Sequence, residues 1–261
     1  MKIVVCVKQV PNTNEVRIDP VKGTLIRDGV ESILNPDDAN ALEEALSLKD
    51  QNEDVKVTVV SMGPPQAKEV LIECLAKGAD EAVLLSDRAF GGADSWATSN
   101  TISAAIKKIA DYDIIFAGRQ AIDGDTAQVG PQIAEKLDIP QVTYVQDFTL
   151  GKDSVTVQRQ LEDGYELIEV KTPVLLTTIK ELNTPRYMSV KGILDAYKKE
   201  IPVWGIDDID VDPSIVGLKA SPTKVFKSFV NPPKGAGMML EGTSKEKVNG
   251  LMENLKDKHI I

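Results

Sequence analysis

The spacing of apolar and polar positions predicts strands and helices that alternate along the first half of the chain. Residues 3–7 form a continuous apolar run, as a strand buried on both faces shows. Similar runs predict further strands over residues 55–60, 81–85 and 113–117. Helical periodicity predicts helices over residues 35–49, 66–77, 93–110 and 126–137. This alternation indicates parallel βαβ units and a doubly wound, mostly parallel, Rossmann-like α/β sheet.

The rhythm changes after residue 141. Four strand-like segments follow with short connections, over residues 142–145, 154–160, 165–171 and 174–179. Glu162-Asp163-Gly164 is a tight-turn signal between the middle two. We therefore expect an antiparallel extension of the sheet. Residues 16–18 and 24–26 flank a turn-rich connection and predict a separate hairpin.

The last part of the chain is punctuated by proline and glycine from Asn183 onward. A final amphipathic helix is expected over residues 244–258, because Thr243 and Glu246 form a capping-box pattern before it. The pattern predicts one α/β domain over residues 1–228 and a linker with a C-terminal arm over residues 229–261. The terminal helix either packs back on its own domain or packs on a partner subunit.

Charge and composition exclude several classes of function. The net charge of -10 argues against nucleic acid and anionic membranes, which require clustered Lys and Arg. No stretch approaches the roughly 20 apolar residues of a membrane span, and the N-terminus does not resemble a secretion signal. We therefore expect a cytoplasmic protein, with Cys6 and Cys74 as buried thiols in a reducing compartment.

A single histidine, His259, stands third from the C-terminus. This excludes Ser-His-Asp and Cys-His catalysis and any metal site built on histidine. No catalytic side chain and no metal ligand is predicted. We expect a bound cofactor to supply the chemistry.

The strongest candidate for a cofactor site is the segment of residues 118–129, which follows the strand over 113–117 and precedes a helix. In parallel sheets, ligands bind beyond the carboxyl ends of the strands. Asp123-Gly124-Asp125 predicts a turn with positive φ at Gly124, and Asp125 or Thr126 is the expected N-cap. The free amides of residues 126–129 would then hold phosphate oxygens. An ordinary capped turn between strand and helix remains the alternative.

Other strand ends open on the same edge of the predicted sheet. The first strand ends at Cys6 and Lys8, and the second at Met62. The helix that begins at Asn35 and Pro36 points to the same place, with Asp37 and Asp38 in its first turn. Arg119 supplies a cation that offsets the acids of the loop. Convergence of these segments predicts a pocket.

Five motifs of the chain resemble the β subunit of electron-transfer flavoproteins. They are VKQVPNT, NPDDANALEEAL, VSMGPPQA, GRQAIDGDTAQVGPQIAEKL and NTPRY. The segment from Val157 to Thr177 is similar to the signature of that family. The resemblance implies a heterodimer with an α subunit, an adenine-nucleotide-binding domain in this chain, and a C-terminal arm that packs on the partner.

The resemblance also implies which residues contact the cofactor. Together with Lys8 from the strand-end argument, the predicted cofactor-binding residues are Cys6, Asn35, Pro36, Asp37, Asp38, Met62, Gly118, Arg119, Gln120, Ala121, Ile122, Asp123, Gly124, Asp125, Thr126, Ala127, Gln128 and Val129.

Two kinds of family member differ in the ligand of this site. Respiratory members hold structural AMP there, whereas electron-bifurcating members hold a second FAD that takes hydride from NADH. The sequences DGDTAQVGP and NPDD resemble the bifurcating, anaerobic type, and the small Gly124 and Ala127 favour the larger ligand. We therefore expect FAD, with AMP as the alternative. A non-redox module that binds an adenine nucleotide also remains open.

The bifurcating type implies further partners. One electron would reach an acyl-CoA dehydrogenase through the FAD of the α subunit, and the other would reach ferredoxin or flavodoxin. Residues 183–199 resemble the family's dehydrogenase-recognition loop. Its predicted partner-binding residues are Pro185, Arg186, Tyr187 and Val190. A plain surface helix over residues 191–199 is the alternative.

Overall fold

The computed structural model describes residues 1–12, 31–226, 235 and 237–261. The hairpin predicted over residues 16–18 and 24–26 lies outside these ranges. So does the predicted domain boundary at 228, which stays a prediction. The chain divides into two compact units, each described here by itself. The first unit contains every described element except the C-terminal helix, which belongs to the second.

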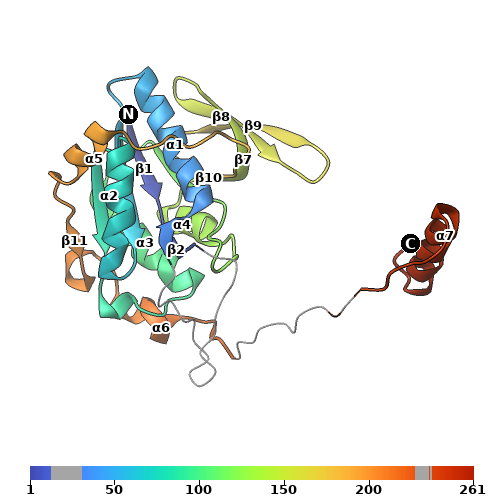
Figure 1. Ribbon diagram of the computed structural model, residues 1–261. Helices are drawn as coiled ribbons and strands as arrows, with labels where there is room; N and C mark the ends of the chain where they lie inside the picture. Colours follow the sequence, from blue (N-terminus) through green and yellow to red (C-terminus); the bar gives the residue numbers. More distant parts are fainter. Residues whose placement is uncertain (13–30, 227–234, 236) are drawn as a thin grey trace. The chain divides into compact units, whose positions relative to one another are not determined.

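A nine-stranded sheet forms the centre of the first unit (Figure 1). In spatial order its strands are β11 (Val203–Trp204), β5 (Glu81–Leu85), β4 (Lys56–Met62), β1 (Lys2–Cys6), β6 (Ile114–Gly118), β10 (Val174–Thr178), β7 (Gln141–Leu150), β8 (Ser154–Gln160) and β9 (Tyr165–Lys171). Neighbours from β11 to β7 pair in parallel, and β7, β8 and β9 pair antiparallel. The predicted parallel sheet with an antiparallel extension is confirmed.

Helices cover both faces of the parallel part of the sheet. The α-helices are α1 (Pro36–Gln51), α2 (Lys68–Lys77), α3 (Ser95–Ile109), α4 (Val129–Leu137), α5 (Val190–Ala196) and α6 (Gly217–Ala220). Leu42 of α1 and Leu71 of α2 share one apolar cluster with Phe116 of β6. Ile133 of α4 lies in a second cluster with Ile115, the neighbour of Phe116. Successive side chains of a strand point to opposite faces, so this alternation places α1 and α2 opposite α4.

The remaining described elements are short or peripheral. A small antiparallel pair joins β2 (Gln9–Pro11) to β3 (Ser32–Leu34). Single 3-10 turns lie at η1 (Pro65–Ala67), η2 (Arg88–Phe90), η3 (Ile206–Asp208) and η4 (Pro213–Ile215). In the second unit, α7 (Ser244–Asp257) begins with the predicted capping box, since Thr243 and Glu246 bond reciprocally. Whether this helix packs on a partner stays a prediction.

The outer edge of the antiparallel extension is β9. Its side chains are mostly exposed, including Tyr165 at 58% and Leu167 at 68%. The apolar residues of β9 are interspersed with charged residues, among them Glu166 and Glu169. This strand pairs only with β8 in the described part of the chain.

The order of strands places a topological switch point between β1 and β6. The chain builds outward from β1 through β4 to β5, and then crosses to β6 on the other side of β1. The loops that leave the carboxyl ends of β1 and β6 therefore diverge, and a crevice opens between them. The segments predicted to hold a cofactor follow these two strands.

Asp38, in the first turn of α1, connects the two strands at the switch point. One carboxylate oxygen accepts a hydrogen bond from the Lys8 amide at 2.8 Å, and the other accepts one from the Gly118 amide at 3.0 Å. A Cβ on Gly118 would overlap the same carboxylate, so this approach requires glycine. The Asp38 residue is 6% exposed. Burial raises its pKa to about 7, although hydrogen bonds from Asn35 and the two amides oppose the shift.

Most predicted boundaries agree with the structure, and α4, β7 and β11 are among the elements that differ. The segments over residues 81–85, 154–160 and 165–171 coincide with β5, β8 and β9. The helix expected from residue 126 begins at Val129, because residues 125–128 are irregular. The strand expected over 142–145 continues to Leu150, since it pairs with β8 over that length. The edge strand β11 was not predicted, because it has two residues between Pro202 and Gly205.

The close packing of α4 on β10 gives a test of this arrangement. A Cβ on Gly130 would lie 2.6 Å from Thr177 Cγ2. We expect Gly130→Ala to destabilise the protein by about 1–3 kcal/mol through overpacking, despite the better helix propensity of alanine. Urea unfolding measures the change. Gly164→Ala is the control, since no atom lies within 4 Å of its added Cβ; equal stability of the two variants would contradict the packing.

The raised pKa of Asp38 predicts a pH dependence of stability. Between the ordinary Asp pKa near 4 and about 7, the folded chain keeps a proton that the unfolded chain has lost. The contribution of Asp38 to the free energy of unfolding therefore falls as pH rises through this window. Unfolding of wild type and Asp38→Asn at pH 5 and pH 8 should show the wild type losing more stability. Asp163→Asn, at an exposed turn, controls for removal of a surface charge, and a pH-independent difference between wild type and Asp38→Asn would refute the assignment.

Candidate functional site

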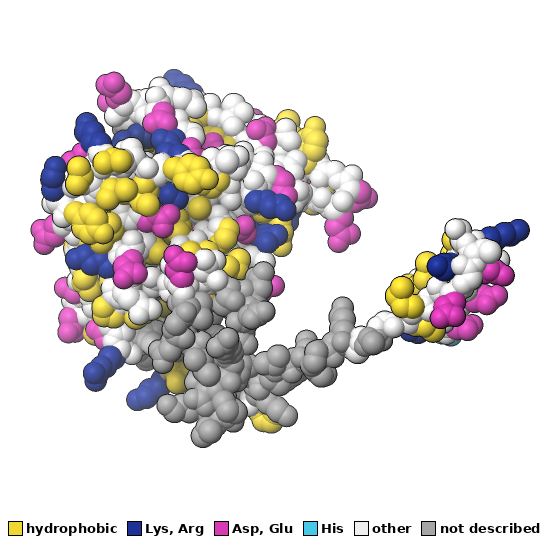
Figure 2. Space-filling view, viewed as in Figure 1, with side chains coloured by type: hydrophobic (Ala, Val, Ile, Leu, Met, Phe, Trp, Pro, Cys, Tyr) yellow, Lys and Arg dark blue, Asp and Glu magenta, His cyan; other side chains and the backbone are white. Residues whose placement is uncertain are grey.

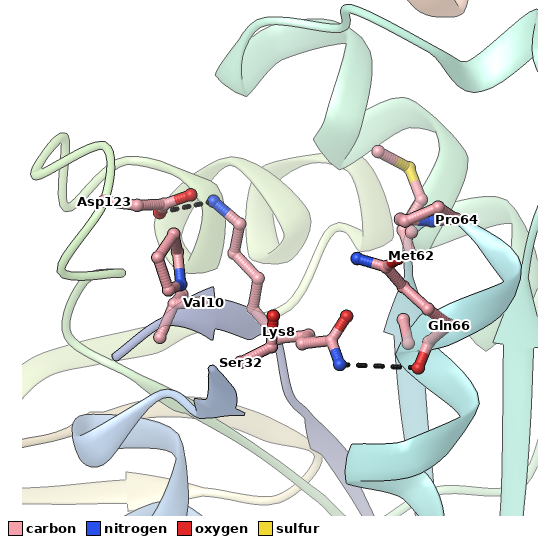
Figure 3. A pocket seen from close by; sticks show the side chains of 11 residues that line it. Lys8, Val10, Ser32, Met62, Pro64, Gln66 and Asp123 are labelled. Carbon is pink, nitrogen blue, oxygen red and sulfur yellow. Dashed lines mark hydrogen bonds and ion pairs between the residues drawn. The ribbon is translucent and has the colours of Figure 1, made fainter. Parts of the chain in front are cut away.

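Lys8 and Asp123 meet across the crevice at the switch point. Lys8 follows β1, and Asp123 lies in the loop of residues 118–129, called here the 118–129 loop. The Lys8 Nζ donates to Asp123 Oδ1 at 2.6 Å, and Figure 3 shows the two side chains directed toward one another. The Asp123 side chain is 14% exposed, so the ion pair is partly shielded from solvent. The pair joins the two loops that diverge at this edge of the sheet.

A cavity of about 110 Å³ lies beside this ion pair. Three of the residues predicted for the site line it, namely Lys8, Met62 and Asp123. The sequence analysis missed the other lining residues, which are Gln9, Val10, Pro11, Ser32, Gly63, Pro64, Gln66 and Ala67. Gly63 and Pro64 directly follow Met62, so a wider reading of that strand end would have included them. The β2–β3 pair, which supplies Ser32, gave no signal in the sequence.

Asn35 holds the 118–129 loop in place. It occupies the predicted N-cap position before Pro36, but its side chain makes no cap hydrogen bond. Its Nδ2 instead donates to the Gln120 carbonyl at 2.8 Å, and its Oδ1 accepts from the Ile122 amide at 3.1 Å. Asn35 is fully buried, so both amide atoms are satisfied by the loop. The start of α1 and the loop are therefore one hydrogen-bonded framework.

The turn within the loop differs from the prediction. The amides of Gly124 and Asp125 donate to the Ala121 carbonyl at 3.2 and 2.9 Å. Positive φ angles occur at Asp125 (56°) and Ala127 (52°), and the predicted positive φ at Gly124 is wrong. The N-cap of α4 is Gln128, so Asp125 and Thr126 do not cap the helix as predicted. Non-glycine residues carry the left-handed conformation here, which is costly and concentrates at functional sites.

Three consecutive amides of the loop lack an acceptor in the described part of the chain, and such amides suit an anion. Among the described residues, no carbonyl or side chain accepts from the amides of Thr126, Ala127 or Gln128. Ala127 is left-handed and Gln128 right-handed, and this succession forms a concave arrangement of N–H groups that suits anions. The positive end of the α4 dipole follows directly at Val129. We call the amides of residues 126–128 the amide cradle.

The side chains around the amide cradle are tied to neighbouring groups. Gln128 Oε1 accepts from Ser95 Oγ at 2.7 Å, which connects the start of α4 to the start of α3. Asp125 accepts a hydrogen bond from Gln120 Nε2. Both carboxylates of the turn, Asp123 and Asp125, therefore have a donor of their own.

Arg119 points toward Asp37 and Tyr144 and does not line the cavity. Its Nε lies 3.4 Å from Asp37 Oδ2, and its guanidinium lies 5.8 Å from the centre of the Tyr144 ring. Burial raises the pKa of Asp37, and the charge of Arg119 opposes that shift. The structure thus gives Arg119 a counter-ion in the first turn of α1.

Cys6, the last residue of β1, is predicted to contact the cofactor. Its side chain is buried, and burial raises the pKa of the thiol to about 12. The thiol is therefore neutral at physiological pH and is not a nucleophile. A contact from this position would use the backbone at the strand end.

The segment of residues 183–190 separates into half-buried and exposed residues. Tyr187 is 98% exposed and Val190 is 78% exposed. Arg186 instead bonds to Glu43 and Asp50 of α1. Partner binding by Pro185, Arg186, Tyr187 and Val190 stays a prediction.

No helix within the described ranges is long and apolar enough to cross a membrane.

Comparison with known proteins gives the family of the chain. The electron transfer flavoprotein domain matches residues 22–209. The chain is 62% identical to the caffeyl-CoA reductase-Etf complex subunit CarD of Acetobacterium woodii, and 64% identical to the electron transfer flavoprotein subunit beta of Clostridium acetobutylicum. It is 53% identical to the acryloyl-CoA reductase electron transfer subunit gamma of Anaerotignum propionicum. Each comparison covers 100% of both chains. The chain therefore belongs to the electron transfer flavoprotein family and is a β-type subunit of it.

Proposed function

We propose that this chain is the β subunit of an electron-bifurcating electron-transfer flavoprotein, and that the amide cradle and the adjoining cavity hold FAD. Bound FAD would supply the chemistry that accepts hydride from NADH and passes electrons on singly. The proposed partners are the α subunit, an acyl-CoA dehydrogenase, and ferredoxin or flavodoxin as the second acceptor. The protein's own groups bind and orient the cofactor and need not act as acid or base.

The amide cradle is the observation that supports the cofactor site most directly. Phosphate oxygens accept from free backbone amides at a helix N-terminus, and the cradle lies at the switch point of the sheet. The nearby acids would repel phosphate if they were unpaired. Asp123 is paired with Lys8, and Asp125 accepts from Gln120. These contacts orient the carboxylates and leave the amides to the ligand.

The cavity and Gly124 support the larger ligand. No atom of the described residues lies within 4 Å of the place that a Gly124 side chain would occupy, so a ligand can approach the backbone there. The cavity continues from Lys8 and Asp123 to Met62 and Gly63 at the end of β4. A dinucleotide extends further than a mononucleotide, so FAD bound at the amide cradle would also reach into this cavity.

The relatives support the redox partners. One belongs by name to a caffeyl-CoA reductase-Etf complex, and another is by name an electron transfer subunit of acryloyl-CoA reductase. Both names join an electron-transfer subunit to an enzyme that acts on an acyl-CoA. We infer a similar acyl-CoA dehydrogenase for this chain.

The cofactor content of the heterodimer tests the proposal. The chain is copurified with its α subunit, and flavin is measured by absorption while AMP is measured after release. Two flavins per heterodimer are expected. One flavin with one AMP would assign the chain to the respiratory type. A heterodimer with no flavin would overturn the redox function and leave an adenine-nucleotide module.

The left-handed residues of the loop give a second test. Valine is disfavoured at the φ of Ala127, so Ala127→Val should destabilise the cradle by about 1–2 kcal/mol and release cofactor. Ala127→Gly relieves the strain and should retain it. Ala110→Val is the matched control, because Ala110 also has a positive φ (57°) but lies before β6, at the opposite end of that strand from the loop, so it should retain cofactor. Cofactor retained per heterodimer after gel filtration is the measurement, and full retention by Ala127→Val would remove the cradle from the site.

A further inference from the structure

Arg186 is bound to a buried carboxylate in the middle of α1. Glu43 accepts from the Arg186 amide at 2.9 Å, from Nε at 2.9 Å and from Nη2 at 2.9 Å. The same Nη2 donates to Asp50 at 2.8 Å. Glu43 is only 9% exposed, and its charge is matched by the planar fork of the guanidinium. Pairing of this kind orients both the side chain and the backbone of Arg186.

A second anchor lies three residues earlier. Asn183 and Asn40 bond reciprocally, since each side-chain amide donates to the carbonyl of the other at 2.8 and 3.1 Å. Asn183 Nδ2 also donates to Glu44 at 3.0 Å. Residues 183–186 are thus held on α1 at two points, about one helical turn apart.

Beyond these anchors, apolar side chains project into solvent. Tyr187, Val190, Leu194 and Tyr197 are between 61% and 98% exposed. Figure 2 shows hydrophobic side chains gathered on the face of the first unit over α2 and α5. We call these four residues the apolar tip.

The inner side of α5 is packed closely on α2. A Cβ on Gly192 would overlap the Ala76 carbonyl, and Ala196 is 1% exposed. The apolar tip is therefore held on the fold at two places: at Arg186, which precedes it, and along the inner side of α5, which carries part of it. A surface that is ordered before binding loses less conformational entropy when a partner docks.

We infer that Arg186 is a positioning residue for partner docking: its bond to Glu43 holds the turn at Tyr187 so that the apolar tip fits the partner dehydrogenase. This inference rests on the proposed function, which supplies the partner. The guanidinium acts through the backbone and does not contact the partner.

The pair of variants Arg186→Lys and Glu43→Gln tests this role. Lysine cannot reproduce the two-pronged bond, and glutamine keeps the shape of Glu43 while removing its charge. Glu43 is buried, so the partner cannot reach it. If Arg186 acts by positioning, both variants raise the KM of the heterodimer for the dehydrogenase by about tenfold, the effect of one lost charge-assisted hydrogen bond, with kcat within twofold.

The measurement is steady-state electron transfer from NADH through the αβ heterodimer to an acyl-CoA dehydrogenase at varied concentration. Active sites are counted by reduction of a dye. The salt dependence of KM is a second readout, because loss of a contacting charge changes its slope and loss of a positioning group does not. Asp163→Asn is the control, since it removes an exposed charge in the turn between β8 and β9, at the other edge of the sheet.

The outcomes separate the inference from the proposed function. If Arg186→Lys raises KM but Glu43→Gln does not, Arg186 contacts the partner directly, and the positioning role is overturned. If neither variant changes KM, the positioning role is overturned as well. A wild-type heterodimer that reduces no acyl-CoA dehydrogenase overturns the proposed function and the inference with it. If either variant fails to fold in thermal melting, Asn183→Ala takes its place and should raise KM by a smaller factor.

Discussion

The carboxylate of Asp38 is the contact on which the candidate site depends. It accepts the amide that follows β1 and the amide that ends β6, and so it spans the two strands that flank the switch point. An aspartate carboxylate has two acceptor oxygens at the required separation, and glycine at 118 lets α1 approach closely enough. Because Asn35 in the same turn holds the 118–129 loop, the N-terminus of α1 determines the positions of both walls of the crevice.

The carboxyl edge of the sheet carries many charges for a proposed anion site, yet they are largely neutralised within the chain. Lys8 pairs with Asp123, and Arg119 pairs with Asp37. Backbone dipoles at the start of α4 would supply positive potential to a phosphate in the proposed site. Backbone amides are positioned by the fold and need no reorganisation when charge arrives. This is consistent with a site that keeps its ligand in one orientation.

The sequence predicts the regular part of the fold and fails where long-range contacts decide. Periodicity located β5, β8 and β9 to the residue, because strand burial is a local pattern. A positive φ in the 118–129 loop was predicted at Gly124, since glycine tolerates it. Asp125 and Ala127 adopt a positive φ instead, in a loop that Asn35 binds at Ile122. The internal role of Arg186 could not be predicted either. Its partner Glu43 is 143 residues away, and an Arg beside an exposed tyrosine favours a surface contact when read locally.

The edge strand β9 has a consequence for handling the protein. A row of unpaired backbone groups beside Leu167 and Tyr165 is a template for pairing with another chain. Glu166, Glu169 and Lys171 interrupt the apolar row, and such charges act as gatekeepers against aggregation. Replacing these charges for crystallisation or labelling would therefore make edge-to-edge association through β9 easier.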